Sequence, residues 1–399
     1  MATNPGRHRG RPYVLHTVLN SKIKMRSIEY QILLAASDVQ PGDNLKEELS
    51  GLMGQEFDQG RLIDMAVREG VAGLLYKNLK KTGMLGYLEH QQIQQLQSSY
   101  YLTVRFNLKL IYDLKEVLQQ LNKKNIKVVL LQGIHLLQQI YQDIGLRPLT
   151  DIDLWVLPET RDAVDEVLSG LDYEKDGLYP NIFKKGSTVI DLNTQILWAD
   201  RIKSRQMLIN EDQEALFQNC RTIDFEGQKA YSLSQPDLIL YLSMHVIKHY
   251  ADRLIWLVDL KNLLQDWKPS DWELLVTRCK ELGQEGAVYY IMFLLTHLFN
   301  CRAPIDMRDS LDVKRMNRLE KMILKNRLNG RPLPVWSPML LFTSGKGFSK
   351  KAAFIFESLF PRPEILRQVF ANFPDLKVWQ LYLRRGRQLF GFIRGGQST

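Results

Sequence analysis

The sequence predicts an α+β fold, in which a small mixed β-sheet is flanked by N-terminal and C-terminal helical regions. Helical patterns dominate the residues before 122, short β-branched and aromatic runs follow, and helical patterns return after residue 200. This order divides the chain into a basic, disordered tail at 1–25, an N-terminal helical region at 26–121, an α/β core at 122–200, a helical region at 201–300 and a basic C-terminal helical region at 301–399.

The N-terminal helical region is recognised by apolar residues spaced three and four positions apart. Val104, Leu108, Ile111 and Leu114 follow this spacing and predict one long amphipathic helix. The Pro-Gly-Asp-Asn stretch at 41–44 predicts a break between two earlier helices, because proline and glycine interrupt regular helix geometry.

The core is expected to alternate strands with helices and to include a hairpin. Lys185-Gly186 fits the turn between two short apolar runs, and the core ends near Trp198-Ala199-Asp200. In chain order we expect a strand at 125–133 that ends at a glycine, a helix at 134–141, a strand at 151–156, a helix at 159–171, a strand within 172–183 and a strand at 187–193.

Helical patterns return in the C-terminal half. Ser234 is a suitable cap for a helix whose first turn holds Pro236 and Asp237. The apolar run at 288–295 predicts a buried helix, because it is much shorter than the roughly 18 apolar residues of a membrane span. Residues 378–392 predict a basic amphipathic helix near the end of the chain.

Two aspartates separated by one apolar residue open the strand expected at 151–156. Side chains alternate along a strand, so Asp151 and Asp153 point the same way and repel one another unless a cation lies between them. Asp191 on another expected strand supplies a third carboxylate. This set predicts a site for two divalent metal ions, an arrangement suited to phosphoryl transfer. Gly133, between a strand and a helix, leaves backbone N–H groups open to a phosphate.

The order of these motifs resembles the DNA polymerase beta-like nucleotidyltransferase superfamily and, within it, an uncharacterised bacterial nucleotidyltransferase family. In that family an apolar strand ending in Lys-Gly precedes a helix and the segment Gly-Leu-Arg-Pro-x-x-Asp-Ile-Asp-Leu-Leu-Val. Gly133, Arg147, Asp151, Asp153 and Asp191 stand at matching positions. The resemblance implies a nucleotidyltransferase core that uses Mg²⁺ or Mn²⁺. It also implies transfer of a nucleoside monophosphate from an NTP to an acceptor, with release of pyrophosphate.

The resemblance further implies roles for individual residues. Asp151, Asp153 and Asp191 would be catalytic and hold the metal ions, and Asp191 would help to deprotonate the acceptor. Nucleotide contacts would come from Gln132, Gly133, Arg147, Thr150, Lys248 and His249. Local chemistry leaves alternatives open, since Arg147 could pair with Asp143, Thr150 could cap a turn, and Lys248 and His249 could belong to a polar stripe packed between lobes.

Two positions depart from the family pattern. Gln132 stands where the family usually has Lys, which removes a phosphate contact, and Asn193 stands where it usually has His. These departures motivate an alternative function, a catalytically weakened nucleotidyltransferase fold that acts as a nucleotide-binding or scaffold protein. The acceptor is left unassigned.

A zinc site is not expected. His245 and His249 share a helix face, as zinc ligands do, but Val246 stands where the metalloprotease pattern requires Glu, and no third ligand is evident.

Positive charge is concentrated towards the end of the chain. The net charge is +9, and residues 301–399 hold 19 Lys and Arg against 7 Asp and Glu. Such a surplus fits nucleic acid, a membrane surface or an acidic partner, or else a solvated surface. Three widely spaced cysteines and a basic N-terminus without an apolar segment favour the cytoplasm. We expect no transmembrane segment, and leave open a peripheral location at the inner face of the membrane.

Overall fold

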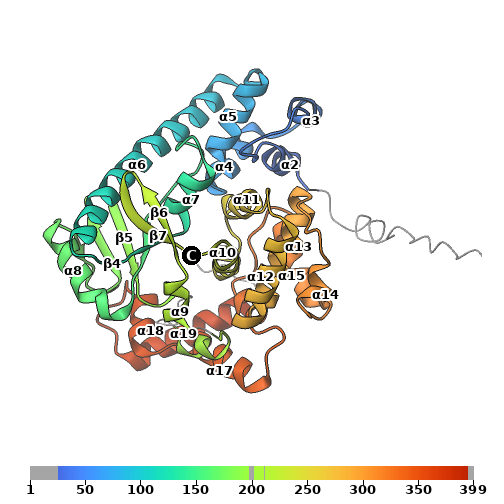
Figure 1. The fold of residues 1–399 in the computed structure, drawn as a ribbon. Helices are drawn as coiled ribbons and strands as arrows, with labels where there is room; N and C mark the ends of the chain where they lie inside the picture. The colour runs from blue at the N-terminus through green and yellow to red at the C-terminus, as the bar shows by residue number, and fades with distance from the viewer. Residues whose placement is uncertain (1–25, 197–201, 211, 394–399) are drawn as a thin grey trace, which may run out of the picture.

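A computed structural model describes residues 26–196, 202–210 and 212–393 and arranges them around a seven-stranded sheet (Figure 1). The expectations for the tail at 1–25 and for the core boundary at 198–200 lie outside these residues. The sheet has the order β3-β4-β5-β2-β1-β7-β6. Its strands are β1 (Val129–Leu131), β2 (Ile152–Trp155), β3 (Glu174–Lys175), β4 (Ile182–Lys185), β5 (Thr188–Asn193), β6 (Arg221–Phe225) and β7 (Gln228–Ser232).

The N-terminal region is built from helices, as predicted. The break at 41–44 separates the first two described helices, and the three-four apolar spacing forms a single helix of 34 residues, α6, which buries Leu110, Leu114 and Leu118. The helices of this region are α2 (Ile28–Ala35), α3 (Leu45–Met53), α4 (Gln59–Arg68), α5 (Ala72–Thr82), the short η1 (Met84–Tyr87) and α6 (His90–Lys123).

The sheet is mixed, as the sequence predicts. β2 runs parallel to β5 and antiparallel to β1, and β4 forms the expected hairpin with β5 through Gly186, whose φ is +58°. The predicted helices of the core are also present. They are α7 (Gln132–Ile140) and α8 (Arg161–Gly170), the latter preceded by η2 (Pro158–Thr160).

The two faces of the sheet have different neighbours. Figure 1 shows α6 along the outer side of the sheet and α10 (Gln235–Lys248) in the middle of the molecule. The hydroxyl of Thr188 in β5 donates to the carboxylate of Asp113 in α6. Because side chains alternate along a strand, Asp191 points to the opposite face, away from α6, and Asp153 shares that face through its register with Asp191.

The expectation of helices alone at 201–300 is wrong for residues 221–232, where β6 and β7 form a hairpin at one edge of the sheet. Glu226 and Gly227 form its two-residue turn, with φ values of +51° and +78°. Such a turn matches the twist of a hairpin. β7 then pairs parallel with β1, so the sheet extends beyond the core boundary expected near residue 200.

Helices form the remainder of the chain. Ser234 caps α10 as predicted, its side chain accepting a hydrogen bond from the Asp237 N–H. The other elements are η4 (Lys203–Met207), α9 (Gln213–Gln218), α11 (Leu254–Leu263), α12 (Pro269–Leu282), α13 (Glu285–Phe299), α14 (Met307–Ser310), α15 (Arg318–Leu328), α16 (Ser337–Leu341), α17 (Phe348–Leu359), α18 (Pro363–Val369) and α19 (Val378–Ile393). Among the described residues, none of the helices has the length and apolarity required to cross a bilayer.

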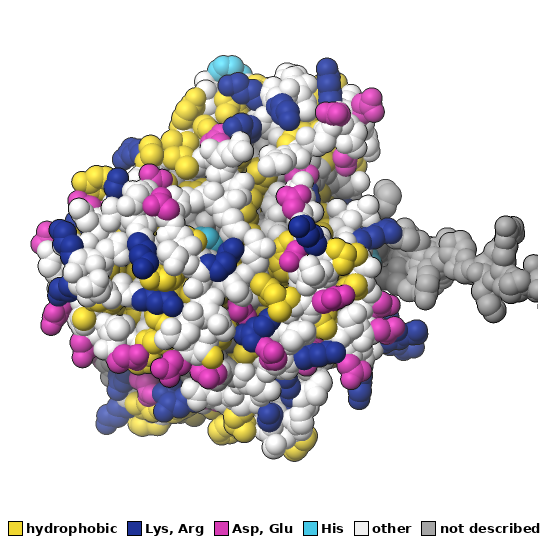
Figure 2. All heavy atoms as spheres, in the orientation of Figure 1, with side chains coloured by type: hydrophobic (Ala, Val, Ile, Leu, Met, Phe, Trp, Pro, Cys, Tyr) yellow, Lys and Arg dark blue, Asp and Glu magenta, His cyan; other side chains and the backbone are white. Residues whose placement is uncertain are grey.

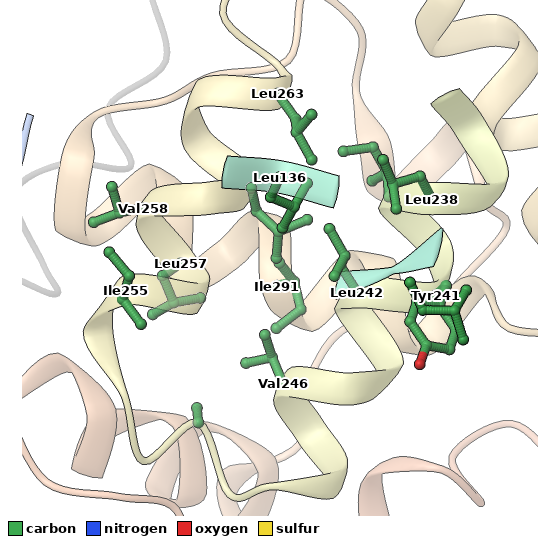
Figure 3. Packing of buried hydrophobic residues seen from close by; sticks show 14 of the residues in the cluster. Leu136, Leu238, Tyr241, Leu242, Val246, Ile255, Leu257, Val258, Leu263 and Ile291 are labelled. Carbon is green, nitrogen blue, oxygen red and sulfur yellow. The ribbon is translucent and has the colours of Figure 1, made fainter. Parts of the chain in front are cut away.

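The main hydrophobic core surrounds α10. Figure 3 shows Leu242 and Val246 of α10 packed among Leu257 of α11, Leu136 of α7 and Ile291 of α13. Every residue from Pro236 to Ile247 is buried, so α10 is surrounded by other parts of the protein on all sides. The helix is thereby held in place against the sheet.

A buried ion pair ties the N-terminal helices to the C-terminal half. Arg327 donates to both carboxylate oxygens of Glu69, at 3.2 and 2.6 Å, and the backbone N–H of Leu254 donates to the same carboxylate at 2.8 Å. Both charged side chains are almost completely buried. The start of α11 is therefore held next to Glu69, which follows α4, and next to Arg327 of α15.

The loop before β2 is held by Asn107, a buried residue of α6. Its amide donates to the carbonyls of Ile144 and Arg147, at 2.6 and 2.8 Å, and its oxygen accepts from the Leu149 N–H at 3.2 Å. We expect Asn107→Ala to lower the free energy of unfolding by about 3 kcal/mol, at about 1 kcal/mol per lost hydrogen bond. Urea unfolding measures this change. A loss no larger than that of Asn122→Ala, on the same helix, would contradict the assignment.

His135 of α7 gives the fold a pH dependence. Its Nε2 lies 2.7 Å from the Ser232 hydroxyl of β7, and burial, with a smaller effect of Arg221, lowers its pKa from 6.5 to about 4. The folded state therefore disfavours the protonated ring. We expect the free energy of unfolding to fall by about 3 kcal/mol between pH 6.5 and pH 4. Urea unfolding across this range should show a flatter profile for His135→Gln, whereas a profile unchanged from the wild type would contradict this origin. Substituting the exposed His90 serves as the control.

Candidate functional site

Strand register brings two of the predicted carboxylates together. Asp153 lies opposite Asp191 in the parallel pair of β2 and β5, and opposite Leu131 in the antiparallel pair of β1 and β2. Neighbouring strands are about 4.8 Å apart, so both side chains stand next to each other on one face. Leu131 is the last residue of β1, and α7 therefore begins beside them.

Asp151 stands one residue before β2 and extends this acidic group. Its carboxylate accepts a hydrogen bond from the exposed Thr150 hydroxyl at 2.9 Å. Burial, followed by the charges of Asp151 and Asp191, raises the pKa of Asp153 well above its ordinary value. Asp151 and Asp191 are thus close enough to Asp153 to disfavour its charge.

Helix α10 supplies side chains that face this group. Tyr241, His245 and Lys248 are spaced i, i+4 and i+7, which places them on one side of the helix. The Tyr241 hydroxyl accepts a hydrogen bond from the Gln132 amide at 3.1 Å. Burial raises the pKa of Tyr241 well above 10, and Asp153 raises it further. Tyr241 therefore presents a protonated hydroxyl near the carboxylates.

Three cations lie near the carboxylates, namely Arg147, Lys248 and Arg253. The charge of Lys248 acts to lower the pKa of Asp153, against the larger effect of burial. Arg253, in the turn between α10 and α11, has its pKa lowered by burial and by Arg147, while the charge of Asp151 acts in the opposite direction. The turn depends on left-handed backbone at the two residues after His249, where φ is +58° and +46°.

His245 and His249 belong to an aromatic cluster. Their rings are 4.5 Å apart, and each lies near the indole of Trp256, at 5.0 and 5.6 Å between centroids. Burial, then the neighbouring charges of His249 and Lys248, lowers the pKa of His245 well below 6.5. In the described part of the chain, no three His, Cys, Asp or Glu side chains are grouped as the ligands of a metal ion.

Arg147 has a partner other than those expected from the sequence. Its guanidinium makes three hydrogen bonds to Asp259 of α11, at 2.7 to 3.0 Å, and Tyr141 donates to the same carboxylate at 2.7 Å. Burial alone would lower the pKa of Arg147, but Asp259 raises it above its ordinary value. The alternative pairing with Asp143 is wrong, because Asp143 pairs with Lys77. The structure thus gives the guanidinium a buried carboxylate where a phosphate was expected.

Gly133 has a packing role that the sequence did not reveal. A Cβ at this position would lie 2.5 Å from Nη1 of Arg147 and 2.7 Å from Cδ2 of Leu149. The space that a side chain would need at Gly133 is therefore filled, whereas contact of its backbone N–H with a phosphate stays a prediction. The preceding residue, Gln132, has a φ of +50°, a strained backbone conformation for a residue with a side chain.

Comparison with known proteins assigns the family. The family model described as "Uncharacterised nucleotidyltransferase" matches residues 55–300, which span the sheet, α10 and α11. The chain belongs to this family. Among solved structures, it is similar to that of the antibiotic-resistance factor ANT(2'')-Ia, with 12% sequence identity and a TM-score of 0.31, over 44% of this chain and 91% of the other. No curated protein matches the chain.

In this family member, the sequence indicated the carboxylates but not all of the residues near them. Tyr241 was missed, although its helical spacing to His245 and Lys248 could have identified it. Arg253 and Asp259 were also missed, because their positions depend on how α11 packs, which no local pattern encodes. Asn193, at the family's usual His position, donates its amide to the Asp191 carbonyl at 3.2 Å.

The tight packing at Gly133 leads to a stability prediction for this nucleotidyltransferase. We expect Gly133→Ala to lower the free energy of unfolding by about 1–3 kcal/mol, because the added methyl displaces Arg147 or Leu149. Urea unfolding compares it with Gly51→Ala, in the interior of α3, where nothing lies within 4 Å of the new Cβ. The control should be neutral or stabilising by up to about 1 kcal/mol. Equal behaviour of the two variants would refute the packing role.

Proposed function

We propose that this family member transfers a nucleoside monophosphate from an NTP to an acceptor hydroxyl or phosphate, with release of pyrophosphate. The observation that carries the proposal is the register of Asp153 with Asp191, beside Asp151 and the start of α7. Membership of the nucleotidyltransferase family supports the reaction class.

The donor chemistry of the site fits Mg²⁺ or Mn²⁺. Asp151, Asp153 and Asp191 offer only oxygen ligands, which hard divalent cations prefer. The raised pKa of Asp153 reflects crowded negative charge that a cation would offset. Mg²⁺ commonly takes one or two carboxylates together with substrate phosphates, so a complete cage of protein ligands is not required. Bound metal would stabilise charge on the attacking and leaving oxygens.

Positively charged side chains near the carboxylates support binding of the triphosphate. Lys248 and Arg253 lie near the carboxylates from the α10 side and its following turn, and the exposed Thr150 hydroxyl lies beside Asp151. The first N–H groups of α7 add the positive end of a helix dipole. Arg147 acts as a positioning residue in this account, since its bonds to Asp259 hold the segment leading to β2.

The reaction is a single displacement at the α-phosphorus of the NTP. The acceptor oxygen forms a bond to this phosphorus while the bond to the oxygen bridging to the β-phosphorus breaks, and pyrophosphate carries that oxygen away. Asp191 accepts the proton of the acceptor hydroxyl. Lys248 and Arg253 offset the negative charge that develops on the departing pyrophosphate.

A second candidate is nucleotide binding without efficient transfer. Gln132 brings no charge to the phosphates, and its amide donates to Tyr241. In this case the protein would bind an NTP as a sensor or scaffold.

Calorimetric titration with ATP, GTP, CTP and UTP, in Mg²⁺ and in EDTA, tests the proposal. We expect one nucleotide to bind with Mg²⁺, and the variant carrying both Asp151→Ala and Asp153→Ala to lose this binding. Asp64→Ala, an exposed residue of α4, is the matched control. Pyrophosphate release from the bound nucleotide then separates transfer from the second candidate. Absence of binding to the folded wild-type protein would refute both.

A further inference from the structure

Helices α17 and α19, and the residue that follows α17, present large apolar side chains to solvent. Phe348 and Phe356 of α17 are 88% and 67% exposed, and Phe360, the residue that follows α17, is 42% exposed. Trp379 and Leu383 of α19 are 59% and 58% exposed. We call these five side chains the C-terminal apolar surface. Figure 1 places α17, α18 and α19 along one end of the molecule, and Figure 2 shows yellow and dark blue side chains together along that edge.

The exposure follows from the helical pattern of α17. Phe354 points inward, where it is buried and its ring meets that of Phe342 at 6.4 Å between centroids. At 100° per residue, Phe348, Phe356 and Phe360 fall together on another side of the helix. The inward side alone anchors the helix, so this second apolar face is not required for the core.

Helix α19 has the same two-sided pattern. Leu381 is buried in a small separate core with Leu366 and Phe370, whereas Trp379 and Leu383, four residues apart, share an exposed face. Burying one side of the helix thus leaves the other side apolar and exposed.

Hydrogen bonds join the two helices into one surface. Arg385 of α19 donates to the carbonyl of Leu359 at the end of α17, at 3.3 Å, and Tyr382 donates to the carbonyl of Pro361 at 2.7 Å. These contacts fix α19 beside the end of α17. The apolar side chains therefore belong to one end of the fold rather than to separately mobile helices.

This end of the molecule is strongly basic. Residues 346–387 contain nine Lys and Arg and three Asp and Glu. Lys350 lies in the first turn of α17, and the exposed Arg384 and Arg387 lie in α19. Exposed aromatic side chains surrounded by Lys and Arg are the combination with which amphipathic helices bind anionic bilayers.

We propose that the C-terminal apolar surface binds peripherally to an anionic lipid bilayer, with the Phe and Trp side chains inserted between headgroups. The positive charge complements anionic lipid, while it would repel a second copy of the same surface. Nucleic acid is disfavoured because Phe348, the most exposed of the five, and the aliphatic Leu383 gain most from an apolar environment. The proposal goes beyond nucleotidyl transfer and does not depend on it.

Vesicle flotation of the full chain tests the proposal. The probes are vesicles of phosphatidylcholine alone and vesicles with added phosphatidylglycerol. We expect binding to the anionic vesicles, weakened by salt. Phe348→Ser with Phe356→Ser should reduce that binding by about tenfold or more, because two apolar side chains lose their lipid environment. The matched control is Tyr101→Ser with Leu102→Ser, two exposed residues of α6 distant in sequence from the surface.

Each outcome decides the question. Loss of flotation in the Phe variant, with retention in the α6 control, supports the proposal. No flotation of the wild type, or equal flotation of all variants, overturns it. The proposal also fails if sedimentation shows that the Phe substitutions instead abolish a dimer, or if RNA binds this surface while vesicles do not.

Discussion

We expect Asp153→Ala to reduce nucleotidyl transfer by about 1000-fold or more, because it removes the central carboxylate of the proposed metal site. The fold should remain intact. Burial and the neighbouring Asp151 and Asp191 raise the pKa of Asp153, so its charge is disfavoured in the folded protein and its removal costs no stability in EDTA. Pyrophosphate release from the nucleotide identified by titration measures the loss, and thermal unfolding measures stability.

The control for this variant is Asp266→Ala, an exposed aspartate after α11. It should retain wild-type transfer. Transfer by Asp153→Ala within about tenfold of the wild type would contradict the catalytic assignment, since loss of an essential electrostatic group is expected to cost about 100-fold or more.

The second large effect is expected from Asp259→Ala. The substitution leaves the guanidinium of Arg147 buried without its carboxylate, and also removes the acceptor of the Tyr141 hydroxyl. Breaking such a pair from one side costs about 3–5 kcal/mol of unfolding free energy. Urea unfolding measures this cost. Transfer should also fall, because Arg147 is close in sequence to Asp151 and Asp153.

Two further variants test whether the unpaired buried charge causes the loss of unfolding free energy. Glu166→Ala breaks the exposed pair with Lys124 and should cost less than about 1 kcal/mol. Replacing Arg147 and Asp259 together by Leu should recover part of the stability, because no unpaired charge is then buried. A double variant less stable than Asp259→Ala would argue against a burial cost as the cause.

Much of the fold could be predicted from local patterns. The three-four apolar spacing located α6, the capping residues located the start of α10, and alternating runs located β2, β4 and β5. The hairpin of β6 and β7 was missed, although Glu226-Gly227 between alternating residues carried a signal for it. Its place beside β1 was not predictable, because a parallel pairing about 100 residues apart leaves no local trace.

In the candidate site, too, contacts between distant segments could not be predicted from local sequence. The alternation of side chains along a strand put Asp151 and Asp153 on one face, and Asp191 was chosen as a carboxylate on another expected strand, but its register with Asp153 was not predicted. The partner of Arg147 could not be located, because Asp259 lies 112 residues away and reaches it only through the packing of α11. The packing of Arg147 and Leu149 against Gly133 was not predicted, for a related reason. A missing Cβ can admit a ligand or a neighbouring side chain, and the sequence alone does not distinguish these.

The proposed transfer requires Asp151, Asp153 and Asp191 to hold a divalent metal ion together with a nucleotide. Electron paramagnetic resonance of Mn²⁺, titrated with protein in the presence of a non-hydrolysable NTP analogue, measures this binding. We expect wild-type protein with the analogue to deplete the signal of aqueous Mn²⁺ beyond what the analogue alone does, and Asp153→Ala and Asp191→Ala to abolish this extra depletion. Equal Mn²⁺ binding by the wild type and both variants would contradict it.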